Sequence, residues 1–142
     1  MNTLKILCTP RNFETDTDVQ DIKDMIENRI DPALFFEINY KTNGMAVLFK
    51  TAFERFKTKS QQQLVKLTQS MGGGKTHNMI SLGLLAKHPK YRKEIIGEDY
   101  NDNGLGEVQV LAFSGRESNI PNGIWGELAR QLGISIKRLK TM

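Results

Sequence analysis

Gly72-Gly73-Gly74-Lys75-Thr76 is the stretch that predicts the fold of this chain most directly. It follows an apolar run at residues 64–67 and precedes a helix-like segment at residues 77–87, the strand, loop and helix order of a phosphate-binding P-loop. Adjacent glycines let backbone N–H groups converge on an anion, because no Cβ obstructs the approach. The N-terminus of the following helix adds partial positive charge. The sequence therefore predicts a nucleoside triphosphate site.

Each residue type in this loop has an expected role. Lys75 is expected to reach the β- and γ-phosphates, and Thr76 to ligate Mg²⁺, so these two are the candidate catalytic residues. The candidate ATP-binding residues are Met71, Gly72, Gly73, Gly74, Lys75, Thr76 and His77. The strict eight-residue fingerprint has a glycine where this chain has Gln69, so the match is incomplete. The alternative is a glycine-rich turn that carries a solvated lysine.

The pattern around the loop predicts an α/β fold. Apolar residues at helical spacing indicate helices at about residues 18–29 and 43–57, and a last amphipathic helix that stops at Gly133. A polar stretch at residues 98–106 reads as a surface loop, and residues 108–113 as a second strand. We therefore expect parallel strands with flanking helices, a partial P-loop NTPase core at residues 61–142, after an N-terminal helical segment at residues 1–60. Arg116 would leave the second strand at the edge that carries the loop, where it could contact nucleotide or a partner.

Composition limits the possible partners. The 142 residues carry a net charge of +4, and residues 61–142 hold eleven basic against seven acidic side chains. Two basic clusters could contact nucleic acid, although such clusters are more often solvated faces; they are Lys87, Lys90, Arg92 and Lys93, and Lys137, Arg138 and Lys140. No run approaches the roughly twenty apolar residues of a membrane span, so we expect a cytoplasmic protein that does not bind membranes.

The chain resembles the N-terminal part of large prokaryotic AAA-like P-loop ATPases, the family named Domain of Unknown Function four-nine-nine, whose genes occur in restriction or phage-defence neighbourhoods. Three blocks at residues 35–45, 71–77 and 113–133 carry the resemblance, which spans about residues 9 to 133. The last block contains Trp125, and it is the most specific because it follows the loop in the expected order. In that family the loop also begins without the first glycine, which implies that Gln69 is a variant.

The resemblance implies ATP as the ligand, with Mg²⁺, and coupling of hydrolysis to conformational work in a defence or DNA-related system. Hydrolysis requires an apolar strand that ends in an acidic residue, and no such run occurs here. We therefore expect a fragment of a longer ATPase, with a core incomplete at its C-terminus, which binds nucleotide and joins the rest of that protein or partner subunits. Two alternatives remain. The chain is a non-catalytic interaction module that docks partners through its amphipathic helices and Trp125, or a basic nucleic-acid-binding module, each with a vestigial P-loop.

Overall fold

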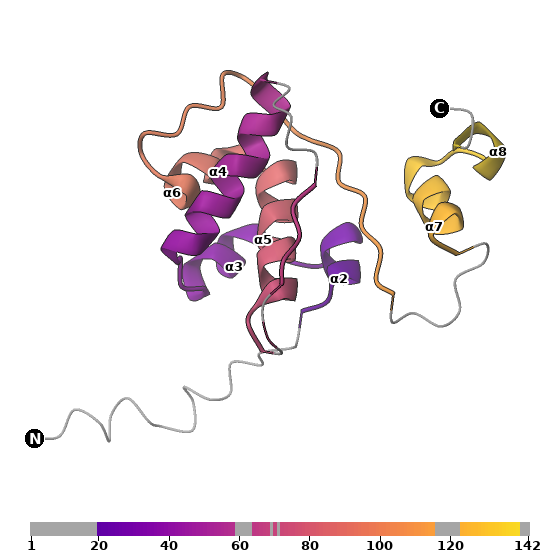
Figure 1. Cartoon of the computed structure of the whole chain (residues 1–142), viewed down its shortest axis with the longest axis horizontal. Coiled ribbons are helices and arrows are strands. Elements are labelled where there is room, and N and C mark those ends of the chain that lie inside the picture. Colours follow the sequence, from indigo (N-terminus) through magenta and orange to yellow (C-terminus); the bar gives the residue numbers. More distant parts are fainter. Residues whose placement is uncertain (1–19, 59–63, 69, 71, 116–122, 140–142) are drawn as a thin grey trace, which may run out of the picture.

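The structure, a computed structural model, describes residues 20–58, 64–68, 70, 72–115 and 123–139. Figure 1 shows a helical assembly joined by two extended segments, residues 64–68 and 105–115. In chain order the helices are α2 (Ile22–Ile26), α3 (Pro32–Ile38), α4 (Asn43–Thr58), α5 (Lys75–Lys87), the 3₁₀ helix η2 (Pro89–Tyr91), α6 (Arg92–Ile96), α7 (Gly123–Leu132) and α8 (Ile136–Leu139).

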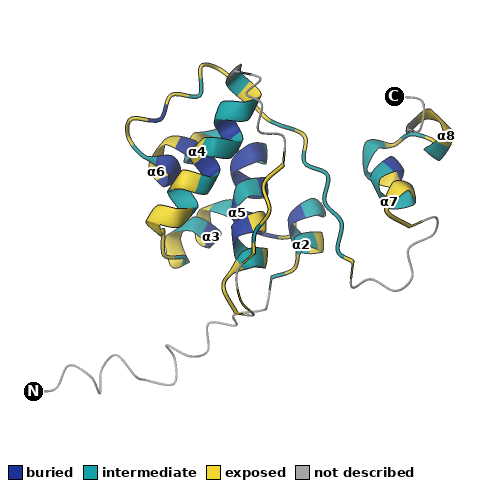
Figure 2. Cartoon of the chain, in the orientation of Figure 1, coloured by how far each residue is buried: buried dark blue, intermediate teal, exposed yellow. Residues whose placement is uncertain are grey.

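Helix α5 is the centre of the fold. It contributes Leu85 and Ala86 to a first core cluster and Ile80 and Leu84 to a second one. The first core cluster adds Phe49 and Phe53 of α4, Ile95 and Ile96 of α6, and Tyr100; the second adds Met25, Ile30 and Phe35. Figure 2 shows the buried residues concentrated on α5 and on the helix faces that surround it. Because both clusters combine residues before and after residue 60, these two parts of the chain share their core.

Local sequence explains where the short helices begin. Asp21 caps α2 by accepting from the Lys23 N–H, while Asp24 closes a reciprocal capping box. Asp31 caps α3 in the same way, and Pro32 occupies the first turn, where a missing N–H costs nothing. Among the described residues, the helix expected at residues 18–29 begins at Ile22 and ends at Ile26, two residues before Asn28, whose φ is 58°. Helix α3 was not expected, because Asp31 and Pro32 were interpreted as residues that end the preceding helix.

The longer helices agree with the sequence prediction. Helix α4 matches residues 43–57 to within one residue, and α7 ends at Leu132, followed by Gly133 at a φ of 65°. Helix α5 begins at Lys75, inside the expected loop, and ends at Lys87 as predicted. Its buried residues lie on more than one side, which fits a central helix enclosed by α2, α3, α4 and α6.

The predicted α/β fold is wrong for the residues that the structure describes, because none of them forms a β-strand. Residues 64–67 and 108–113, the two predicted strands, form no strand ladder with each other or with another described segment; Val108 instead donates its N–H to the Ala86 carbonyl of α5 at 2.9 Å. A strand is defined by a hydrogen-bonded neighbour, and apolar composition alone does not supply one. The partial P-loop NTPase core of parallel strands is therefore replaced by helices packed around α5.

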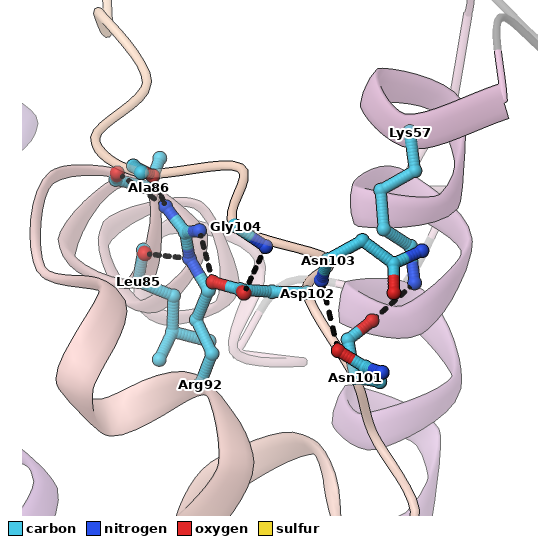
Figure 3. Close-up of polar contacts among 9 residues, drawn as sticks. Lys57, Leu85, Ala86, Arg92, Asn101, Asp102, Asn103 and Gly104 are labelled. Atoms are coloured by element: carbon cyan, nitrogen blue, oxygen red, sulfur yellow. Dashed lines mark hydrogen bonds and ion pairs between the residues drawn. The ribbon is translucent and has the colours of Figure 1, made fainter.

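Arg92 fixes the C-terminal end of α5. Its guanidinium is 1% exposed and donates to the carbonyls of Leu85 and Ala86, 2.8 Å from each, and to the Gly106 carbonyl at 2.6 Å. It also pairs with the Asp102 carboxylate at 3.0 Å and stacks over Phe53. Figure 3 shows this arginine between the end of α5 and the loop at residues 101–104. The expected surface loop at residues 98–106 is thus bound to the core, and it buries Tyr100.

Candidate functional site

The glycine-rich loop leads directly into α5. Gly72 and Gly74 adopt φ values of 80° and 71°, in the left-handed region that residues with a Cβ rarely enter. Gly74 is the N-cap of α5 and has no side chain to cap the first turn. A Cβ placed on either glycine would meet no atom within 4 Å, so the glycines are needed for backbone conformation and not for space. The loop residues Gly72, Gly73 and Gly74 are all exposed.

The first turn of α5 has backbone donors that no described residue accepts from. Gly73 donates its N–H to Ser70 at 3.1 Å, and the Asn78 N–H reaches the Gly74 carbonyl at 2.9 Å. The described residues provide no acceptor for the N–H groups of Gly74, Thr76 and His77. Unsatisfied N–H groups at a helix N-terminus, together with the helix dipole, favour an anion. The Thr76 side chain is exposed beside them.

Lys75 turns back onto the loop that precedes it. Its ammonium Nζ donates to the Ser70 carbonyl oxygen at 2.8 Å, across five residues of sequence. The ammonium therefore shares the Ser70 carbonyl with the Gly73 N–H, and the Lys75 side chain is half-buried. The sequence did not reveal this contact, because it joins a side chain to a backbone carbonyl whose position depends on the glycine conformations.

His77 connects this loop to α3. Its ring stacks on Phe35 with centroids 5.0 Å apart and planes at 20°. Burial lowers the pKa of His77, because the charged imidazolium loses hydration there. The next residue, Asn78, is buried, and its Oδ1 has no hydrogen-bond partner in the structure. The loop is thus attached to the core by stacking on one side and exposed on the other.

Two predicted site residues, Met71 and Arg116, lie outside the described part of the chain. The first predicted basic cluster does not form a common surface. Arg92 is buried, and Lys87 is directed inward, donating to the Met25 carbonyl at 3.0 Å. Lys93 pairs with Glu98 at 3.1 Å on the surface.

The second predicted basic cluster and Trp125 lie near the C-terminal end of the described chain. Lys137 and Arg138 are exposed on α8, whereas Lys140 is outside the described residues. Trp125, on α7, is 52% exposed, so most of its ring contributes no packing to the two core clusters.

An apolar groove runs along α5 just beyond the loop. Its volume is about 650 Å³, and Met79, Leu82 and Gly83 of α5 line it together with both extended segments. Neighbouring helices complete the lining, with Ile22 and Met25 from α2 and Thr51, Ala52, Arg55 and Phe56 from α4. No sequence pattern marks this groove, because residues from five segments form it only after folding.

The described residues contain no group of three or more histidine, cysteine, aspartate or glutamate side chains that could hold a metal ion. None of the described helices is long and apolar enough to cross a membrane.

Comparison with known families gives one match. Residues 12–110 match the DUF499 N-terminal domain, so the match covers well over half of the chain and includes the loop and α2 to α6. Helix α7 and its tryptophan lie beyond the matched residues. No curated protein and no solved structure matches the chain. The chain therefore belongs to the DUF499 family and contains the N-terminal domain of that family at residues 12–110.

Proposed function

We propose that this chain binds ATP with Mg²⁺ at the glycine-rich loop. The observation that carries the proposal is the combination of two left-handed glycines, N–H groups at the start of α5 that have no acceptor among the described residues, and a lysine ammonium bound to the Ser70 carbonyl of the same loop. A polyphosphate bound there would accept from the N–H groups of Gly74, Thr76 and His77. It would also attract Lys75 away from the Ser70 carbonyl, exchanging a neutral acceptor for an anionic one, and charge-assisted hydrogen bonds are the stronger kind.

The remaining loop residues have separate roles in this proposal. Thr76, which is exposed at the first turn, would hold Mg²⁺ through its hydroxyl, and the cation would supply positive charge to the bound polyphosphate. Phosphoryl transfer to water needs in addition a carboxylate that positions the attacking water. We propose ATP hydrolysis, conformational work and a role in phage defence or DNA metabolism only for a protein in which such a carboxylate lies next to this loop.

The test is binding of a fluorescent ATP analogue to the whole chain, with and without Mg²⁺. Lys75→Ala should weaken binding at least tenfold, about 1.4 kcal/mol or more, because the ammonium no longer neutralises phosphate charge. Lys50→Ala removes the same charge from an exposed position on α4 and should leave the affinity unchanged. Thr76→Ala should reduce the increase in affinity that Mg²⁺ provides. Equal weakening by Lys75→Ala and Lys50→Ala would show that only general charge is sensed, and would refute the site.

A further inference from the structure

We infer that the aromatic stack of His77 on Phe35 fixes the first turn of α5 for anion binding, which makes His77 a positioning residue of the loop and α3 its support. This inference rests on the proposed function, because it explains how the N–H groups of Thr76 and His77 keep the direction that a bound polyphosphate requires. The imidazole itself does not contact the ligand. It acts through the backbone that carries those N–H groups.

The first turn of α5 has little support from its own loop. Its N-cap is Gly74, which supplies no side-chain hydrogen bond, and both Gly72 and Gly74 have left-handed φ values. The first backbone hydrogen bond of the helix joins the Asn78 N–H to the Gly74 carbonyl at 2.9 Å. A helix end without a side-chain cap is less stable, and glycine adds backbone freedom. A rigid first turn therefore needs a contact from outside the loop.

His77 supplies such a contact. Its ring centroid lies 5.0 Å from that of Phe35, with the planes 20° apart, and Phe35 is 2% exposed within the second core cluster. The hydroxyl of Ser81, which is fully buried, donates to the His77 carbonyl at 2.8 Å. His77 is thus held at its ring by α3 and at its carbonyl by the next turn of α5. Groups that are fixed before the ligand arrives lose less entropy on binding.

The ring acts by stacking and not by charge. Burial lowers the pKa of His77 below its ordinary value of 6.5, so the imidazole is neutral at neutral pH and adds no positive charge to the loop. A phenyl ring can stack on Phe35 in the same way, whereas a methyl group cannot. His77→Phe and His77→Ala therefore separate the effect of the stack from that of the imidazole nitrogens.

The experiment measures the affinity of the full chain for the fluorescent ATP analogue with Mg²⁺. His77→Ala should weaken binding about fivefold, the size of one aromatic pair interaction, and His77→Phe should bind as the parent does. Phe35→Leu should weaken binding to a similar degree, and little further when combined with His77→Ala, because both remove the same contact. Phe53→Leu, the same change in the first core cluster, is the matched control and should leave the affinity unchanged. Circular dichroism and thermal melting establish that each variant is folded.

Order parameters from ¹⁵N relaxation of the ligand-free chain are the second readout. They should decrease at residues 76 and 77 in His77→Ala and keep the parent values in His77→Phe. The inference is overturned if His77→Ala binds as tightly as the parent, if His77→Phe binds as weakly as His77→Ala, or if Phe53→Leu weakens binding as much as Phe35→Leu. A parent chain that binds no analogue refutes the proposed function, whereas order parameters that His77→Ala leaves unchanged refute the positioning role separately.

Discussion

Replacement of Arg92 by methionine should lower the free energy of unfolding more than the removal of any charged side chain on the surface. The guanidinium is 1% exposed and bonds three carbonyls and one carboxylate, those of Leu85, Ala86, Gly106 and Asp102. Methionine retains much of the apolar volume but supplies no donor. Removal of the guanidinium leaves three carbonyls without this donor, at about 1–3 kcal/mol for each acceptor that stays buried and unpaired, whereas the Asp102 carboxylate, 27% exposed, regains part of its hydration. We expect the free energy of unfolding to fall by about 4 kcal/mol.

Urea and thermal unfolding followed by circular dichroism would measure this change. For a domain of this length, about 4 kcal/mol corresponds to a decrease in Tm of roughly 10–15 °C. Lys93→Met, one position away, is the control, because the Lys93 and Glu98 side chains are 64% and 84% exposed. Exposed pairs contribute at most about 1 kcal/mol, so its Tm should change by no more than a few degrees. If Arg92→Met and Lys93→Met lose the same small amount, then Arg92 does not hold α5 to the loop at residues 101–106.

Two further predictions concern packing and pH. Gly83→Ala would ordinarily stabilise a helix, but the new Cβ would lie 1.9 Å from Met25 Sδ. We therefore expect the free energy of unfolding, measured with denaturant, to decrease by about 1–3 kcal/mol. A smaller decrease in the Met25→Ala background would attribute the effect to that contact. Burial lowers the pKa of His77 and of His88 below the ordinary value of 6.5, so the unfolded chain binds more protons than the folded chain. Their contribution to stability should therefore be complete above pH 6.5 and decrease as the pH falls through the pKa values of the folded state. Thermal melts between pH 8 and 5.5 should show this decrease, which His77→Phe should reduce while retaining the stack on Phe35; a Tm that rises on acidification would contradict the assignment.

The sequence predicted the helices whose apolar residues repeat over several turns. Helices α4 and α7 were expected from such spacing, whereas α5 was expected because it follows the glycine-rich loop; the ends of all three lie within a few residues of the prediction. The short helix α3 was missed because Asp31 and Pro32 serve both to interrupt a chain and to begin a helix. The surrounding packing decides between these roles, and sequence spacing does not report it.

The strands were predicted wrongly for a different reason. Residues 64–67 and 108–113 have the composition of buried strands, and Figure 1 shows both as extended segments outside the helices. Whether they become strands depends on a hydrogen-bonded neighbour, which is a property of the assembled fold. The same limit applies to Arg92, which was placed in a basic surface cluster because charged residues are mostly exposed; its four partners come together only in the folded chain.

The candidate site was predicted in part. Glycine spacing located the loop and identified Lys75 and Thr76, and the left-handed φ values of Gly72 and Gly74 agree with the predicted need for glycine. The Ser70 carbonyl that holds Lys75 and the Phe35 ring that stacks on His77 could not be predicted, since both contacts depend on folded geometry. Binding of ATP at this loop remains a prediction.

An NMR titration of the ¹⁵N-labelled chain with ATP and Mg²⁺ tests that prediction most directly. We expect saturable shifts at the amides of Gly72, Gly74, Thr76 and His77, with the largest change at the first turn of α5, and no such shifts in Lys75→Ala. Amide resonances in this loop that stay unchanged at millimolar ATP, or shifts confined to Lys137 and Arg138 on α8, would contradict the account.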